Sequence, residues 1–333
     1  MKKIIFIFIF FITTFFANED IRFFGAAIEG FPTIESVYKL EYEFNFTPNL
    51  IEFYIQFDKN NKNLFSNLKN SLKVLKSFEI IPVITIEPMY IEKGKEITIN
   101  YEKILNKEYD NFLLSLTNEI KEIDLPIIIR FAQEMNLNRY HWGTSLKEYG
   151  PNSTEIYKKM YRYIYFFFKK ENVKNALFAF CPNVESIPNE SFNDLTNYYP
   201  GSDVVDLFGL DGYNFGKCAN KNNMGWESKW RSFNDIFSSS LSKLKSLSNK
   251  PIIIFEMASA IKGGNREKWI EDALQDFEKF NLKGLIWFQI NKECHWKINK
   301  NNEKEKIKIF FDINKILINR FFEELLNEKN KIT

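Results

Sequence analysis

The sequence predicts one α/β domain folded as a single (β/α)8 barrel, and three observations predict it. Eight short runs of β-branched and aromatic residues recur along the chain, each with the character of a buried parallel strand. Amphipathic segments lie between them, and strands that alternate with helices form βαβ units of a parallel sheet. The 333 residues suffice for one barrel, which needs about 250, and no Pro-, Gly- or Ser-rich linker divides them.

The strands are predicted in chain order from the apolar runs. They are Ile21–Ala27, Leu50–Phe57, Ile80–Glu87, Pro126–Phe131, Ala176–Cys181, Val204–Asp211, Ile252–Glu256 and Gly284–Gln289. The helices are predicted from apolar positions at helical spacing. They are Leu64–Phe78, Tyr109–Ile123, Glu155–Lys169, Trp230–Leu247, Lys268–Phe280 and one last helix from Glu303 to Asn327.

Long polar tracts follow four of the predicted strands. Because the carboxyl ends of barrel strands share one rim, we expect these tracts to lie together, and loops of this length are usually functional. Their aromatic residues suit stacking against sugar rings, or alternatively hold the loops in place. The tracts are Pro88–Asn100, Asn136–Ser153, Pro182–Gly201 and Tyr213–Glu227, and the aromatic residues are Tyr140, Trp142, Tyr213 and Trp226.

The N-terminal residues have the pattern of a secretory signal peptide. Lys2 and Lys3 precede an almost wholly apolar run from Ile4 to Phe16, and Ala17 follows it. We predict a signal peptide over residues 1–17 and a barrel domain over residues 21–328, with an uncleaved anchor as the alternative. The predicted location is secreted, periplasmic or at the cell surface.

Composition excludes several classes of partner. The 45 Lys and Arg residues and 43 Asp and Glu residues are scattered, which argues against nucleic acid or an anionic membrane surface. The three cysteines are odd in number and widely spaced, so neither a disulfide framework nor a zinc site is predicted. We expect no cofactor, no metal ion and a monomeric chain.

Two glutamates are the candidate catalytic residues. Glu134 and Glu256 each end a run that is predicted to be a buried strand. Carboxylates at this mouth of a barrel lie where such enzymes keep their chemistry, and a pair of them is the minimum needed to cleave a glycosidic bond. The alternative is that each carboxylate only pairs with a nearby Arg or Lys.

Six segments, in this order, resemble motifs of glycoside hydrolase family 26, a family of β-mannanases. They are 81–88, which ends in Glu87-Pro88; 130–136, followed by Trp142-Gly143; 180–183; 198–213, which ends in Asp211-Gly212-Tyr213; 250–256; and Trp287-Phe288. The resemblance covers roughly residues 21–298. It implies a (β/α)8 barrel that hydrolyses a β-linked polysaccharide or oligosaccharide with retention, and without a metal ion. Glu134 would be the general acid/base and Glu256 the nucleophile.

Two further residues are expected to assist. Arg130 lies four residues before Glu134, on the same strand face by even spacing, and would reach across the barrel to Glu256 and hold it ionised. Tyr213, at the mouth of the neighbouring strand, would donate a hydrogen bond to the same carboxylate. Alternatively, Arg130 only fills the barrel interior and Tyr213 only packs the rim. Trp287 would be the stacking platform under the sugar that is cleaved. Further substrate contacts would come from Asn183, Glu87 and Trp142.

Two departures from the family pattern bear on the substrate. Gln133 stands before the candidate acid/base where the family usually has His, at a position that contacts the sugar near its 2-hydroxyl. Ile86 stands where the family commonly has Trp. β-1,4-mannan is therefore the first expected substrate of a secreted endo-acting glycanase, and a β-glucan or xylan is the alternative. A second alternative is a carbohydrate-binding protein that has lost turnover.

Overall fold

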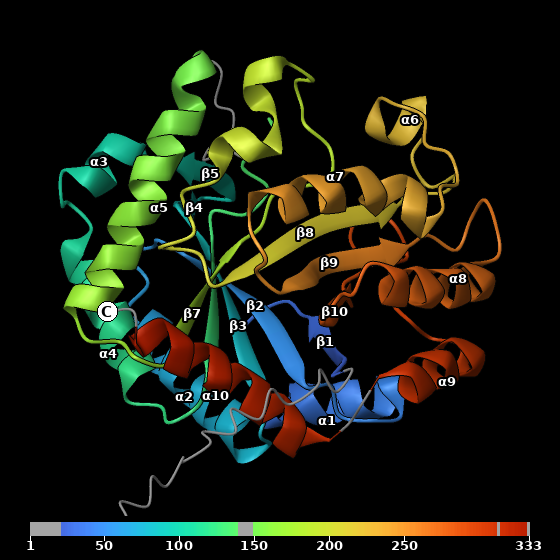
Figure 1. The fold of residues 1–333 in the computed structure, drawn as a ribbon, viewed down its shortest axis with the longest axis horizontal. Helices are drawn as coiled ribbons and strands as arrows, with labels where there is room; N and C mark the ends of the chain where they lie inside the picture. The colour runs from blue at the N-terminus through green and yellow to red at the C-terminus, as the bar shows by residue number, and fades with distance from the viewer. Residues whose placement is uncertain (1–20, 139–148, 312–313, 332–333) are drawn as a thin grey trace, which may run out of the picture.

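Eight parallel strands close into a barrel in the order β1-β10-β9-β8-β7-β6-β3-β2, and helices surround it (Figure 1). The computed structural model describes residues 21–138, 149–311 and 314–331. The predicted signal peptide and Trp142 lie outside these residues. The predicted fold class is confirmed.

All eight predicted strands are present in the barrel. Strands β8 and β9 end three residues later than predicted. The tract after β3, which was predicted as a loop, contains an antiparallel hairpin of β4 and β5. The bounds are β1 Phe23–Ala27, β2 Leu50–Gln56, β3 Ile81–Glu87, β4 Met89–Glu92, β5 Lys95–Thr98, β6 Ile127–Phe131, β7 Ala176–Phe180, β8 Leu207–Asn214, β9 Ile252–Ser259 and β10 Gly284–Phe288.

The helices cover the barrel with their apolar faces. Helices α1, α7 and α8 begin at polar side-chain caps, as at Ser232, whose hydroxyl accepts the backbone N–H of Asp235. The bounds are α1 Ile34–Phe44, α2 Leu64–Ser77, α3 Tyr101–Leu105, α4 Asp110–Lys121, α5 Ser153–Lys170, α6 Lys221–Met224, α7 Phe233–Leu247, α8 Arg266–Lys279, α9 Asn301–Phe310 and α10 Lys315–Lys331.

The prediction of one C-terminal helix from Glu303 to Asn327 is wrong, because the segment divides into α9 and α10. Phe311 leaves the helical conformation with φ −93° and ψ 136°. The two parts pack on different surfaces: a buried ion pair of 2.7 Å between Glu303 and Arg266 holds α9 on α8, whereas Phe322 on α10 packs on Phe23 of β1. A single straight helix cannot reach both surfaces.

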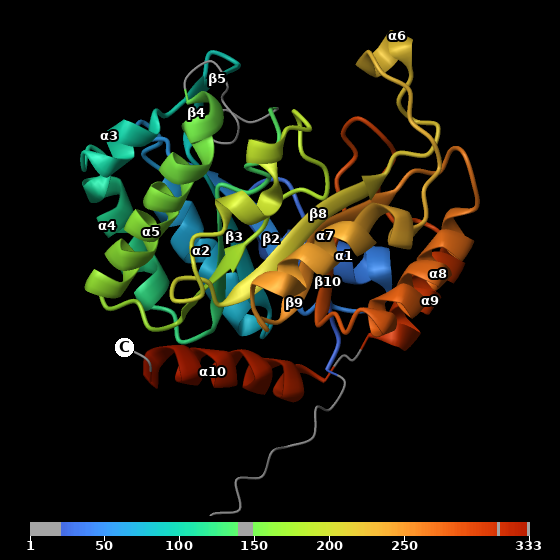
Figure 2. The same ribbon diagram turned by 45° about the horizontal axis from the view of Figure 1, so that its top comes forward.

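Helix α10 closes the amino end of the barrel, and α6 projects at the opposite end (Figure 2). The Lys329 ammonium donates to the carbonyl of Ala176, the first residue of β7, at 2.6 Å and pairs with Asp206 at 2.9 Å. The carboxyl end of the barrel is therefore the open one. Within the described parts of the chain, no helix combines the length and apolar character that crossing a bilayer requires.

Candidate active site

Polar side chains of five strands meet inside the open end of the barrel. Strand β2 shows how the sequence places them, because side chains alternate between the two faces of a strand. Glu52, Tyr54 and Gln56 reach neighbouring polar groups of the interior, whereas Phe53 and Ile55 are buried apolar residues between them.

Glu134 reaches the interior through an irregular backbone. Strand β6 ends at Phe131, and Ala132 and Glu134 then adopt left-handed conformations, with φ of 48° and 52°. Such a conformation is unfavourable for residues with a β-carbon and is often found at functional sites. The backbone N–H of Glu134 donates to the carbonyl of Cys181 at 2.9 Å, which fixes the turn. The expectation that Arg130 and Glu134 share one strand face is therefore wrong, since Glu134 lies beyond the strand.

Glu256 is placed by an irregularity in β9. The pairing register with β8 shifts between Leu210 and Asp211, so that Asp211 is opposite Glu256. A β-bulge of this kind adds one residue and changes the direction of the side chains that follow. Asp211 and Glu256 are thereby brought to the same level of the barrel.

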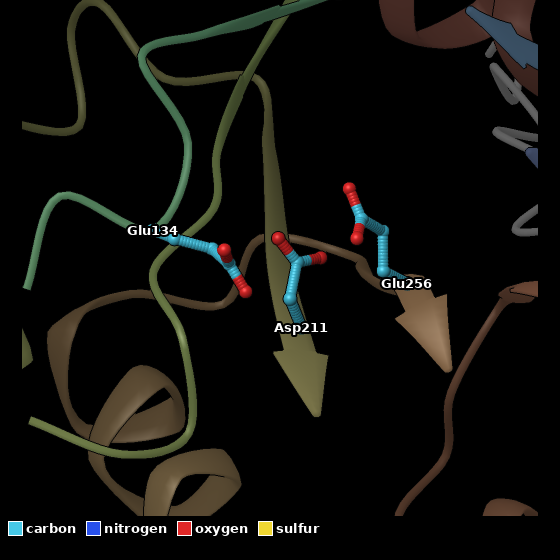
Figure 3. Close-up of side chains that lie close together, drawn as sticks. All are labelled: Glu134, Asp211 and Glu256. Carbon is cyan, nitrogen blue, oxygen red and sulfur yellow. The ribbon is translucent and has the colours of Figure 1, made fainter. Parts of the chain in front are cut away.

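The two candidate catalytic glutamates lie close together, with Asp211 between them (Figure 3). One carboxylate oxygen from each of Glu134, Asp211 and Glu256 lies within 4.8 Å of the other two. Three carboxylates also offer oxygen ligands to a cation, but Arg130 already supplies a positive charge to two of them. The separation suits a carboxylate pair that acts on one bond from two sides.

Arg130 is the centre of the buried charge cluster. Its side chain is fully buried; Nη1 donates to both oxygens of Asp211, at 2.9 and 3.0 Å, and Nη2 donates to Glu256. Nε donates to Thr85 at 2.9 Å and lies 3.1 Å from Glu52. The predicted contact between Arg130 and Glu256 is present in the structure, and one planar guanidinium bridges three carboxylates.

Three donors surround the Glu256 carboxylate. Arg130 and Tyr54 donate to Oε1, the latter at 2.9 Å, and Tyr213 donates to Oε2 as expected from the sequence. Burial by itself raises the pKa of Glu256. The charge of Arg130 and the hydrogen bonds from Tyr213, Arg130 and Tyr54 lower it by more than burial raises it, so the pKa lies below its ordinary value. Glu256 is therefore held as a carboxylate.

The other two carboxyl groups on Arg130 differ from Glu256. Burial raises the pKa of Glu52 to about 8, against the opposing charge of Arg130. Burial likewise raises the pKa of Asp211 well above its usual range, again opposed by Arg130 and reinforced by the neighbouring Glu256 and Glu134. One guanidinium cannot neutralise three buried carboxylates, so protons remain on the cluster while Glu256 keeps its charge.

Glu134 and Glu87 each have an amide partner. The side-chain amide of Asn183 donates to Glu134 at 2.6 Å. Gln56 donates to one oxygen of Glu87 at 2.6 Å, and Gln133 donates to the other at 3.3 Å. Burial raises the pKa of Glu87, although the hydrogen bonds from Gln56 and Gln133 oppose the shift. The structure thus brings Asn183, Glu87 and Gln133 to the mouth of the barrel, where substrate contact was expected.

The prediction that Trp287 is a stacking platform is wrong. Trp287 is fully buried and faces the layer between barrel and helices, where it shares a small apolar cavity with Phe233 of α7 and Ile270 of α8. The side chain of the next residue, Phe288, lies on the opposite face of β10 and packs edge-on against Tyr213, with ring centroids 5.6 Å apart. The strand alternation therefore places Phe288, not Trp287, at the mouth.

A disulfide framework was not predicted from the sequence, but the structure contains a disulfide. Cys218, after β8, and Cys294, after β10, form a disulfide with their Cα atoms 6.0 Å apart, and Cys181 is a buried free cysteine. The two bonded residues are separated by 76 positions in the sequence. They meet because β8 and β10 flank β9 in the barrel, so the loops after them lie on either side of Glu256.

Several residues that interact in the site were not among the candidates. Beside Asp211 and Thr85 they include Glu52, Tyr54, Gln56 and Trp296. Glu52, Tyr54 and Gln56 have a signal in the sequence, since a strand that alternates polar and apolar residues inside a fully covered barrel directs its polar side chains to the interior. Trp296 has no such signal. It lies beyond β10 and packs on Tyr213, with ring centroids 5.3 Å apart.

The chain is similar to known proteins in sequence. A model of glycosyl hydrolase family 26 matches residues 90–258, about half of the chain. Endoglucanase H of Acetivibrio thermocellus is 32% identical over 206 residues, which are 61% of this chain and 22% of that protein. The mannan endo-1,4-β-mannosidase of Bacillus subtilis is 27% identical over 124 residues, 34% of this chain and 33% of that protein. The chain thus matches only a fifth to a third of the length of these curated relatives.

Solved structures are similar in fold. The catalytic domain of the GH26 endo-β-1,4-mannanase of Bacillus sp. JAMB-750 superposes with a TM-score of 0.63 at 19% identity, covering 86% of this chain and 85% of that one. A GH26 β-mannanase from Bacteroides ovatus gives 0.59 at 16% identity, covering 88% of each chain. At these identities the likeness establishes the shared barrel.

Proposed function

This chain belongs to glycosyl hydrolase family 26, and we propose that it is a retaining, endo-acting β-glycanase. The observation that carries the proposal is the pair Glu134 and Glu256, whose nearest carboxylate oxygens lie within 4.8 Å at the open end of the barrel. Retaining glycosidases hold their two carboxyl groups about 5–5.5 Å apart, whereas inverting enzymes keep them roughly 6.5–9.5 Å apart to admit a water molecule.

The environment of each glutamate supports its proposed role. Glu256, ionised and held by Arg130, Tyr54 and Tyr213, attacks the anomeric carbon and forms a glycosyl-enzyme. Glu134, which accepts from Asn183, gives its proton to the departing glycosidic oxygen. It then takes a proton from the incoming water, whose oxygen displaces Glu256 from the anomeric carbon.

The configuration of the first product tests this mechanism. In an NMR time course with an aryl β-oligoglycoside, we expect the β-anomer of the released sugar to appear first and the α-anomer only through mutarotation. Initial release of the α-anomer would contradict the nucleophile role of Glu256.

β-1,4-mannan is the first candidate substrate, since the family pattern and two curated relatives point to it. β-glucan is a second candidate that two observations favour. Gln133 stands where the family usually has His, and it is bonded to Glu87 rather than free to adopt a new position. The relative with the longer match carries the name endoglucanase H.

Release of reducing sugar from β-mannan, β-glucan and xylan distinguishes these substrates. Soluble β-mannan cleaved at internal bonds supports the first candidate, and cleavage of β-glucan alone selects the second. Binding without release from any of them would contradict the proposed enzyme and leave a carbohydrate-binding protein. We further propose that the protein is secreted, periplasmic or at the cell surface, as its N-terminal sequence suggests and as suits a polysaccharide substrate.

A further inference from the structure

A row of four aromatic rings leads from the candidate nucleophile to the surface of the rim. Tyr213, which donates to Glu256, packs on Trp296 at 5.3 Å between ring centroids. Trp296 packs on Phe215 at 5.1 Å, and Phe215 packs on Trp226 at 5.1 Å. Tyr213 and Phe215 are half-buried, Trp296 is 1% exposed, and Trp226 at the outer end of the row is 44% exposed.

Trp226 is held on an ordered loop. The side-chain oxygen of Asn214, the last residue of β8, accepts the backbone N–H groups of Gly216 and Arg231 and so closes the base of the loop. Ser228 and Ala219 are joined by backbone and side-chain hydrogen bonds that pair the two sides of the loop. Trp226 therefore presents part of an apolar ring face to solvent from a fixed loop.

The disulfide ties this loop to the segment that carries Trp296. Cys218 lies in the loop after β8, and Cys294 lies two residues before Trp296. The side-chain amide of Asn223, in α6, donates to the carbonyl of Cys218 at 2.8 Å and links the disulfide to the helix next to Trp226. The covalent bond therefore fixes the loop that carries Trp226 relative to the segment that carries Trp296.

We propose that Trp226 forms an outer sugar-binding position on the glycone side of the cleft, and that the Cys218–Cys294 disulfide holds it in place. The inference rests on the proposed glycanase function. Glu134 protonates the leaving group and so marks the aglycone side, and it follows β6. The row instead spans the loops after β8 and β10, which flank Glu256 on β9. The exposed face of an indole ring favours a flat apolar partner, and the C–H face of a sugar ring is one.

Aryl β-glycosides with one to four sugar residues test the position, because all their sugars occupy the glycone side and the aryl group occupies the leaving-group side. For the wild type we expect kcat/KM to rise as sugars are added. In Trp226→Ala we expect kcat/KM for the longest substrates to fall by about five- to tenfold, mainly through a higher KM, while kcat/KM for the shortest substrate is unchanged. Trp226→Phe restores most of the rise. Tyr42→Ala, a ring that is 82% exposed on α1, is the matched control and changes nothing.

The disulfide is tested with Cys218→Ser/Cys294→Ser on the same series. We expect the same selective loss on long substrates as in Trp226→Ala, and no additional loss when the three substitutions are combined. A uniform loss at every substrate length, or no loss for Trp226→Ala, overturns the binding position. A double Ser variant that keeps the full rise overturns the positioning role of the disulfide.

Calorimetric titration of the unlabelled oligosaccharides separates this inference from the proposed function. If the wild type binds but cleaves nothing, and Trp226→Ala weakens binding of the longer chains only, the glycanase proposal fails and the outer position stands. If the wild type cleaves and the variant binds and cleaves as the wild type does, the glycanase stands and the outer position fails. If the wild type neither binds nor cleaves, both fail.

Discussion

Arg130 on β6 donates a hydrogen bond to Glu256 on β9, three strands away around the barrel. The same guanidinium donates to both oxygens of Asp211 on β8, one of the two strands between β6 and β9. The charge of the candidate nucleophile is therefore set from across the barrel interior, by a residue that is itself fully buried.

Replacing Arg130 by Lys should lower kcat/KM by about 100-fold or more, because a lysine keeps the charge but cannot bond to three carboxylates at once. The acid limb of the pH profile of kcat/KM should move to higher pH, since the pKa of Glu256 rises when the contact from Arg130 is lost. Steady-state kinetics between about pH 3 and pH 9 measure both effects. Arg162→Lys, at an exposed ion pair with Asp203, serves as the control and should leave the profile unchanged.

Replacing Glu256 and replacing Glu134 should impair catalysis in different ways. Glu256→Ala should lower kcat by roughly four orders of magnitude on every substrate, because no glycosyl-enzyme forms. Glu134→Ala should keep its first step on an activated aryl glycoside, and azide should accelerate the second step and yield a β-glycosyl azide. Glu185→Ala, an exposed carboxylate near the end of β7, should behave as the wild type. Equal loss in both variants, with no azide product, would remove the division of roles.

Glu52 should make stability depend on pH. Its pKa is about 8 in the folded protein against 4.5 as an isolated group, so the folded state binds the extra proton between these values. Stability contributed by this group is therefore present at low pH and falls as pH rises from about 4.5 to about 8. Glu52→Gln, which mimics the neutral form, should leave the melting temperature near that of the wild type at about pH 5 and raise it by a few degrees at about pH 9. Thermal unfolding of this variant and of the exposed control Glu41→Gln decides the matter; a parallel response of the two would contradict it.

Gln133→His should shift substrate preference. The amide of Gln133 bonds to Glu87, and an imidazole differs from it in shape and titrates near neutral pH. We expect the ratio of kcat/KM for mannan oligosaccharides to that for glucan oligosaccharides to rise by about tenfold. Gln133→Asn keeps the amide, and it should lower both values without changing the ratio. An unchanged ratio in the His variant would show that this position does not select the sugar.

Removing the disulfide should also lower global stability. The bond joins residues 76 positions apart, and restricting so long a loop contributes about 2–4 kcal/mol to the free energy of unfolding. Denaturant titration of Cys218→Ser/Cys294→Ser measures this loss. Cys181→Ser, at the buried free cysteine, separates loss of the bond from loss of a sulfur atom, and only the double variant should lose its response to a reducing agent.

The sequence allowed the eight strands to be predicted because most of them are nearly continuous apolar runs that the barrel buries on both faces. Glu134 and Glu256 were found because each follows such a run. Their approach to each other depends on features without a local signal, namely the left-handed backbone at Ala132 and Glu134 and the register shift of β9. Bulges of this kind follow from packing against neighbouring strands.

The errors have physical causes as well. Trp287 was assigned to the cleft from its motif, but only the position of a residue within the alternation of β10 decides which face it occupies, and the neighbouring Phe288 has the inward direction. Cys218 and Cys294 are brought together by the order of strands around the barrel, which sequence spacing does not reveal. The alternation of polar and apolar residues around Glu52, Tyr54 and Gln56 can be seen in the sequence. It predicts interior polar contacts once β2 is known to be covered by helices.

The seam between β1 and β10 joins the first and last strands of the barrel, from Phe23 paired with Gly284 to Ala27 paired with Phe288. During synthesis, β1 therefore has an unpaired edge until most of the chain has left the ribosome, and such an edge is open to wrong partners. Contacts this distant in sequence also make folding slow. We expect refolding from denaturant to pass through an aggregation-prone intermediate with an open sheet, and production in cells to improve at low temperature or with added chaperones.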